Sequence, residues 1–101
     1  MTAAAARPRR TRPDRNQRQL VRELRAIGMV VWDVHDKGGE CLDLIVCWRG
    51  RCVPVEVKAS GHEADLTAGE LQAIRNLGYI GVRAIIATSA EDVVAAWEDG
   101  V

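Results

Sequence analysis

The sequence predicts an α/β fold in which a mixed four-stranded sheet is flanked by helices. Two apolar stretches rich in β-branched residues, 43–48 and 51–58, enclose a Gly-containing turn, which is the pattern of a β-hairpin. An amphipathic segment, 67–77, follows the hairpin, and a further short apolar stretch, 82–87, comes after it. A strand–helix–strand succession of this kind places its two strands parallel in one sheet.

The first helix is expected to begin at Asp14 and to stop at Gly28. Asp14 is a suitable N-cap, and Gln17 stands three residues later, as in a capping box. Four apolar residues at helical spacing should form its buried stripe: Leu20, Val21, Leu24 and Ile27. Residues 29–35 are expected to form the first strand, and 36–40 a loop with two glycines.

The turn sets the register of the hairpin. If Arg49 and Gly50 are the two loop residues, the numbers of paired residues sum to 99, so Asp43 lies opposite Glu56. Lys58 shares their face because side chains repeat every second residue. The other face is apolar and should form the core: Leu42, Leu44, Val46, Trp48, Val53, Val55 and Val57. A slip of one residue would bury both carboxylates, so the register is strongly specified.

The second half of the chain supplies two helices and the last strand. Thr67 and Glu70 form a capping box for a helix that should end before Gly78. Its inward residues are expected to be Leu71, Ile74 and Leu77. Residues 82–87 should form a central strand, and Ser89 should cap a final helix. The inward residues of that helix are expected to be Val93, Val94 and Trp97.

The charge of the 101-residue chain is unevenly distributed, although its formal net charge is zero. Residues 14–101 should form one domain, whereas residues 1–13, rich in Ala, Arg and Pro, should be a disordered basic arm. Eight arginines face two acids in the first 25 residues, and this asymmetry indicates a polyanionic partner. The candidate nucleic-acid contacts are Arg7, Arg9, Arg10, Arg12, Arg15 and Arg18. A solvated tail that aids solubility is the alternative.

The chain carries no membrane or disulfide signature. No apolar run approaches the roughly 20 residues needed to cross a bilayer, and no secretory signal is apparent, so we expect a cytoplasmic protein. The three cysteines lack CxxC spacing, which argues against a disulfide framework or a zinc site. Cys47 and Cys52 could face each other across the hairpin; two buried thiols are favoured, with a redox-sensitive pair as the alternative.

Two carboxylates opposite each other destabilise a sheet unless a cation lies between them. Asp43 and Glu56 would suit a hard divalent ion, for which Mg²⁺ is the usual occupant. The alternative is a salt bridge between Glu56 and Lys58, or solvated charges on an exposed face of the sheet.

The element order, with Asp43 on one hairpin strand and Glu56-x-Lys58 on the next, resembles the PD-(D/E)XK (restriction-endonuclease-like) nuclease superfamily. Within it, the chain is similar to small phage and bacterial Holliday-junction-resolvase-like and VRR-NUC nucleases, over about residues 14–97. The matching positions are Asn16 and Gln17, Gly38 and Gly39, residues 42–46, 49–51 and 55–58, and Leu66, Thr67 and Glu70. Leu42 stands where a proline usually precedes the aspartate.

The resemblance implies an αβββαβ core and a Mg²⁺-dependent deoxyribonuclease, with Mn²⁺ as a substitute, in a bacterial or phage-infected cell. It implies catalytic roles for Asp43, Glu56 and Lys58, and a metal-ligating carbonyl at Val57. The partner is DNA, with structure-specific cleavage and a homodimer as options. Two other functions stay open: an inactive DNA-binding module of the same fold, and a protein-interaction subunit that uses the acidic body.

The resemblance also names residues around the centre. Such enzymes often carry a further acid on the first helix, and Gln19 is the position that matches it, with Gln17 and Glu23 nearby. Whether Gln19 or Glu23 takes that role leaves the number of metal ions open. Glu70 has a supporting place at the edge of the site. The residues expected to lie near DNA are Gly38, Gly39, Ser60 and His62.

Overall fold

The structure is a computed structural model, and it describes residues 15–37 and 42–101. Its elements are α1 (Arg15–Ala26), β2 (Val30–Asp33), a 3₁₀ helix (His35–Lys37), β3 (Leu44–Trp48), β4 (Arg51–Val57), α2 (Ala68–Tyr79), β5 (Ile85–Ala87) and α3 (Ala90–Glu98). The predictions for the cap at Asp14, the arm 1–13, and Gly38 and Gly39 lie outside the described residues.

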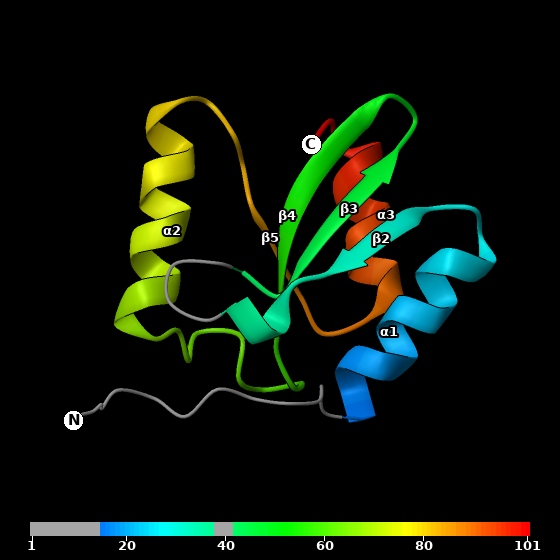
Figure 1. Ribbon diagram of the computed structural model, residues 1–101, viewed down its shortest axis with the longest axis horizontal. Coiled ribbons are helices and arrows are strands. Elements are labelled where there is room, and N and C mark those ends of the chain that lie inside the picture. The colour runs from blue at the N-terminus through cyan, green and yellow to red at the C-terminus, as the bar shows by residue number, and fades with distance from the viewer. Residues whose placement is uncertain (1–14, 38–41) are drawn as a thin grey trace.

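The four strands form one mixed sheet in the order β2-β3-β4-β5 (Figure 1). The pairs β2/β3 and β3/β4 are antiparallel, whereas β4 and β5 are parallel. The α/β class, the four-stranded mixed sheet and the C-terminal helix are therefore confirmed. The expectation that 82–87 forms a central strand is wrong. The β3–β4 hairpin occupies the centre of the sheet, and β5 pairs with β4 alone.

The hairpin has the predicted two-residue turn and register. Arg49 and Gly50 have φ of 49° and 81°, and a turn with two positive φ values matches the twist of the flanking strands. Leu44 pairs with Val55, as a register sum of 99 requires. The guanidinium of Arg49 lies 4.0 Å from the centroid of the Trp48 ring, which adds a cation–π contact at the tip.

The core lies on the predicted face of the hairpin, between the sheet and the helices α1 and α3 (Figure 1). The predicted inward residues are buried: Leu42, Leu44, Val46, Val53, Val55 and Val57. Trp48 is half-buried and meets Trp97 of α3, with ring centroids 6.2 Å apart. Trp97 Nε1 also donates to the backbone oxygen of Trp48 at 3.0 Å, so the C-terminal helix is tied to the hairpin tip.

In the first helix, Leu20, Val21 and Leu24 are buried as predicted, but the two ends differ from the prediction. Ile27 is 50% exposed, because α1 ends at Ala26 and the chain turns at Gly28, where φ is 98°. Gln17 is buried in place of an apolar residue. The first strand is shorter than expected, and His35 lies in the 3₁₀ helix that follows it.

The second helix is held mainly at its N-terminal end. It runs through Gly78 to Tyr79, so the expected stop before Gly78 is wrong. Leu71 is 38% exposed, while Glu70 and Ala73 are the buried residues. The inward face predicted for α2 is therefore only partly correct, because α2 lies across β4 and β5 from α1 and α3, away from the main core (Figure 1). In α3, Val93 and Trp97 are buried as predicted and Val94 is half-buried.

Cys47 and Cys52 face each other across the hairpin, as the register predicts, but they form a disulfide. The favoured prediction of two buried thiols is therefore wrong, and Cys52 is exposed. Their Cα atoms are 3.9 Å apart, since a two-residue turn makes this a non-hydrogen-bonded pair, where opposing residues approach most closely.

Among the described helices, none has the combined length and apolar character that a bilayer crossing requires.

Leu44→Ala is expected to lower the free energy of unfolding by about 2–5 kcal/mol, because Leu44 is fully buried in the core and truncation leaves a cavity. Leu71→Ala, the same change at a partly exposed position of α2, should cost less than about 1 kcal/mol. Urea denaturation measures both values. Equal losses would contradict the assignment of the core to the α1–α3 side of the sheet.

Candidate active site

The candidate site begins where the pairing of β3 and β4 ends. The last pair is Leu44 with Val55, and Asp43 stands one residue before β3. Asp43 Oδ2 accepts a hydrogen bond from Val57 N at 2.9 Å, and the Asp43 side chain is buried. A carboxylate thus takes a backbone donor at the point where the strands stop pairing, which fixes the orientation of Asp43.

Glu56 and Lys58 lie on the face of β4 that is turned away from the core. Glu56 alternates with the core residues Val55 and Val57 and is itself almost completely buried. Lys58 follows β4, and its backbone N donates to Ala87 O at 2.9 Å. Lys58 Nζ lies 3.5 Å from Glu56 Oε2, so the predicted carboxylate and amine are neighbours.

Glu70 brings the N-terminus of α2 to the same place. Its Oε1 accepts from Lys58 Nζ at 2.9 Å and from Thr67 N at 2.9 Å. Thr67 Oγ1 in turn accepts from Glu70 N at 3.1 Å, which completes the predicted capping box. Because one carboxylate serves both the cap and the lysine, the start of α2 and the position of the Lys58 amine depend on each other.

The pKa values of Glu56, Glu70 and Lys58 depend on burial and on the contacts among these three side chains. Burial raises the pKa of Glu56 to about 9, and its hydrogen bond with Glu70 and the charge of Asp43 act in the same direction. Burial would also raise the pKa of Glu70, but hydrogen bonds from Glu56, Thr67 and Lys58 outweigh it and lower the value to about 2. Burial opposes the charge of Lys58, yet its contacts with Glu70 raise its pKa above the ordinary value. At neutral pH, Glu56 therefore holds a proton, Glu70 is ionised and Lys58 is charged.

The start of α1 contacts this end of the sheet. Asn16 Nδ2 donates to the backbone oxygen of Lys58 at 2.9 Å. The buried Gln17 donates through Nε2 to Asp33 Oδ1 at 3.3 Å. The exposed arginines of the first turns of α1, Arg15 and Arg18, consequently lie at the same end of the molecule as the acids.

Sequence reasoning did not identify Asp33 and His35. Asp33 Oδ1 accepts from His35 N at 3.1 Å and contacts His35 Nδ1. The His35 side chain is 10% exposed, and its Nε2 is a buried atom without a hydrogen-bond partner among the described residues. The available signal was their spacing: two polar residues two apart at the end of the apolar stretch 29–35 share one face of a strand.

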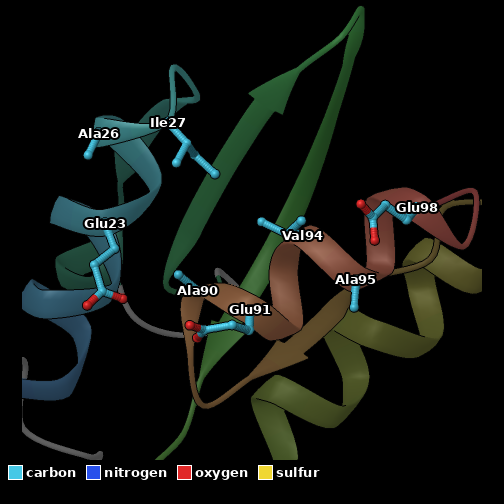
Figure 2. Close-up of a pocket in the computed structure, with 8 residues that line it drawn as sticks. All are labelled: Glu23, Ala26, Ile27, Ala90, Glu91, Val94, Ala95 and Glu98. Carbon is cyan, nitrogen blue, oxygen red and sulfur yellow. The ribbon is translucent and has the colours of Figure 1, made fainter.

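Two of the predicted supporting residues lie elsewhere. Gln19 and Glu23 are exposed and bond to each other at 3.1 Å, so the structure does not bring them to Asp43 and Glu56. Figure 2 shows Glu23 at the rim of an apolar groove between α1 and α3. This groove has a volume of about 610 Å³ and lies on the side of the sheet that faces the core helices, whereas the acids lie on the other face.

The loop before α2 carries two of the expected DNA contacts. Ser60 and His62 are both exposed. His62 Nδ1 pairs with Asp65 Oδ2 at 2.7 Å, which is a local contact within the loop. The loop itself begins directly after Lys58, so both side chains are close in sequence to the candidate site, and no contact of theirs with Asp43 or Glu56 occurs among the described residues.

The donor chemistry of the two buried carboxylates, Asp43 and Glu56, fits a magnesium ion. No group of three or more His, Cys, Asp or Glu side chains within residues 15–37 and 42–101 is arranged to hold a metal ion. Mg²⁺, however, is commonly bound by only one or two carboxylates and keeps several waters. Asp43 and Glu56 can supply two such oxygens, and a cation would have to displace the proton on Glu56.

A scan against protein-family models, a search of curated proteins and a search of solved structures each found no match to this chain. Its function has to be inferred from the side chains themselves. The most informative of these are the two buried acids beside a charged amine at the end of the β3–β4 ladder.

Glu56→Gln is expected to remove a decline of stability with rising pH. The folded protein keeps the Glu56 proton up to a pKa of about 9, whereas the unfolded chain loses it near 4.5. This stabilisation is complete below pH 4.5 and is lost as the pH rises through 9, by up to about tenfold in the unfolding equilibrium per pH unit. The pKa of about 2 at Glu70 acts in the opposite sense, since its contribution is lost as the pH falls from 4.5 through 2.

Urea denaturation across that pH window measures the effect. Glu63→Gln, at an exposed position of the neighbouring loop, is the matched control and should leave the pH dependence unchanged. If wild type and Glu56→Gln lost stability at the same rate above pH 4.5, the raised pKa of Glu56 would be excluded.

Glu70→Ala is expected to destabilise the protein more than Thr67→Ala. Thr67→Ala removes half of the capping box and should cost about 1 kcal/mol. Glu70→Ala removes the other half and also leaves Lys58 with the longer contact to Glu56, so we expect a loss of about 2–3 kcal/mol. Thermal and urea denaturation compare the two variants, and equal losses would show that Glu70 acts as a cap alone.

Proposed function

We propose that this chain is a divalent-cation-dependent nuclease that hydrolyses DNA phosphodiester bonds. The observation that carries the proposal is the convergence of buried Asp43 and Glu56 with the Lys58 amine where β3 and β4 stop pairing. Burying two acids is costly unless they are compensated. Here a proton on Glu56 and the Lys58 amine compensate the two acids. A cation can replace the proton and a phosphate can bind the amine, so the arrangement suits catalysis better than stability.

Asp43 and Glu56 would hold the ion, with the carbonyl of Val57 as a further candidate ligand. A bound Mg²⁺ or Mn²⁺ would lower the pKa of a water and neutralise charge on the phosphate. The Val57 N–H keeps the Asp43 carboxylate in place. Glu56 would have to lose its proton for both acids to present charged oxygens to the ion.

Lys58 would stabilise the negative charge that develops on the phosphate, or orient the attacking water. Its pKa is raised, so the amine is charged at neutral pH. Glu70 holds the amine at 2.9 Å and is itself held by the cap of α2, so the charge is positioned before substrate arrives. Preorganised charge of this kind needs no rearrangement during the reaction. Glu70 is a positioning residue in this proposal.

The architecture supports placing the chain in the PD-(D/E)XK superfamily. The order helix, three strands, helix, strand, with an added C-terminal helix, is the one that the resemblance implies. Asp43 directly precedes β3, Glu56 lies in the adjacent strand β4, and Lys58 directly follows β4, close to the arrangement expected of that superfamily. DNA is proposed as the substrate because the resembling enzymes act on DNA, and the exposed Arg15 and Arg18 lie at the same end of the molecule.

A single cation is the simplest form of the site. The described part of α1 carries one acid, Glu23, and this residue lies at the groove between α1 and α3. Gln19 is exposed and bonds to Glu23, which leaves Asn16, bonded to the Lys58 carbonyl, and the buried Gln17 as the residues of α1 placed to support the site. We therefore propose that Gln17 supports the site through Asp33 and that neither Gln19 nor Glu23 binds a second ion.

An inactive DNA-binding module of the same fold is the second candidate. The observation that favours it is the position of the Lys58 amine, which lies 2.9 Å from Glu70 and 3.5 Å from Glu56 and so compensates charge among the acids by itself. This candidate predicts salt-sensitive DNA binding and no cleavage with any cation.

Asp43→Asn is expected to lower DNA cleavage by at least about 100-fold. The amide oxygen can still accept from Val57 N, but the negative charge that holds the ion is gone. The assay is a panel of branched, flapped and linear DNAs with Mg²⁺ or Mn²⁺, and DNA affinity is measured separately. Asp99→Asn, the same change at an exposed position after α3, is the control and should cleave like wild type.

Two outcomes would count against the nuclease. Undiminished cleavage by Asp43→Asn would reject the assigned site. DNA binding by the wild type without cleavage of any member of the panel would favour the inactive module. Asp43→Asn should also unfold at nearly the same urea concentration as wild type, which separates lost chemistry from lost folding.

A further inference from the structure

Trp32 is exposed in the middle of strand β2. Trp32 is 61% exposed, whereas its neighbour Val31 is 4% exposed and packs in the core. A large aromatic side chain left in solvent on a regular strand is a more informative feature than an exposed aliphatic residue, because tryptophan side chains are buried in most folded proteins. The question is what the exposed indole contacts.

Trp32 lies on the same face of the sheet as the two acids. It pairs with Ile45 across β2 and β3, and Ile45 is two residues from Asp43. Side chains two apart share a face, so Asp43 is a diagonal neighbour of Trp32, about 7–8 Å away between Cα atoms. That separation is on the scale of one nucleotide along a strand. A phosphate at Asp43 would therefore place an adjoining base within reach of the indole.

A fixed positive charge lies beside Trp32. Arg25 Nη2 donates to Val31 O at 2.8 Å, and β2 is an edge strand of the sheet, so the guanidinium is held at the open edge. Figure 1 shows α2 on the β4–β5 side of the molecule and β2 on the other, so α2 leaves this part of the face uncovered. An aromatic platform next to a cation is the combination by which proteins bind single-stranded nucleic acid.

We infer that Trp32 stacks on an unpaired nucleobase of the DNA strand whose phosphate lies at Asp43 and Glu56, with Arg25 beside the backbone of that strand. The inference rests on the proposed function and narrows its substrate class. The preferred DNA carries a single-stranded segment next to the bond that is cut, as a flap, an overhang or an opened branch does. A fully paired duplex keeps its bases stacked on each other and cannot use the platform.

The test measures DNA affinity without divalent cations, so that no cleavage occurs. Fluorescence anisotropy compares a single-stranded oligonucleotide with a blunt duplex of the same sequence, both at low salt. Trp32→Ala should weaken binding to the single strand by about tenfold or more, which is the usual cost of losing one base–aromatic stack. Trp32→Phe should retain most of the affinity. Val30→Ala, an exposed residue further along the same strand, is the matched control and should bind like wild type.

The outcomes separate this inference from the nuclease itself. If Trp32→Ala binds the single strand as wild type does, or loses affinity for strand and duplex equally, the inference falls while cleavage can still be observed. If Trp32→Ala weakens binding to the single strand but the wild type cuts no substrate, the stacking inference is supported and the proposed nuclease activity is rejected. If Trp32→Ala instead converts a dimer to a monomer in sedimentation, a second copy covers this face and the inference is overturned. Urea denaturation confirms that each variant is folded.

Discussion

The hydrogen bond from Val57 N to Asp43 Oδ2 is the contact on which the candidate site depends. It forms where the β3–β4 ladder ends at Leu44 and Val55, and it substitutes a side-chain acceptor for a backbone one. The consequence is structural and chemical at once. The donor of a buried strand end is satisfied, and a carboxylate is held rigidly beside Glu56, on the face opposite the apolar core.

Charge compensation explains why so many acids can gather there. Glu56 carries a proton and Glu70 is ionised. The Lys58 amine lies 2.9 Å from Glu70 and 3.5 Å from Glu56. The same contacts anchor α2, which is held by its polar N-terminal end more than by apolar packing, as the exposure of Leu71 indicates. The stability of α2 and the electrostatics of the site are therefore coupled. A substitution that weakens the cap of α2 should also change the pKa values of Glu56 and Lys58, and the reverse should hold.

Much of the fold could be predicted because it depends on short-range rules. The positive φ of Arg49 and Gly50 and the alternation of the strands set the hairpin register, which in turn puts Asp43, Glu56 and Lys58 on one face. The capping box of α2 depends on Thr67 and Glu70, which are three residues apart, so it too was visible in the sequence. The predictions that failed concern residues where an element ends or contacts another element, as at Ile27.

The sequence by itself determined the hairpin, its register and the set of residues that could form a centre, because turn geometry and side-chain periodicity are local. Only the tertiary structure decided that Gln17 turns inward to Asp33, that Glu23 lies at a separate groove and that β5 ends the sheet. It alone also decided how deeply Glu56 is buried, which raises the pKa of this carboxyl. These features depend on burial and on contacts between segments far apart in the chain, and a one-dimensional pattern does not carry that information.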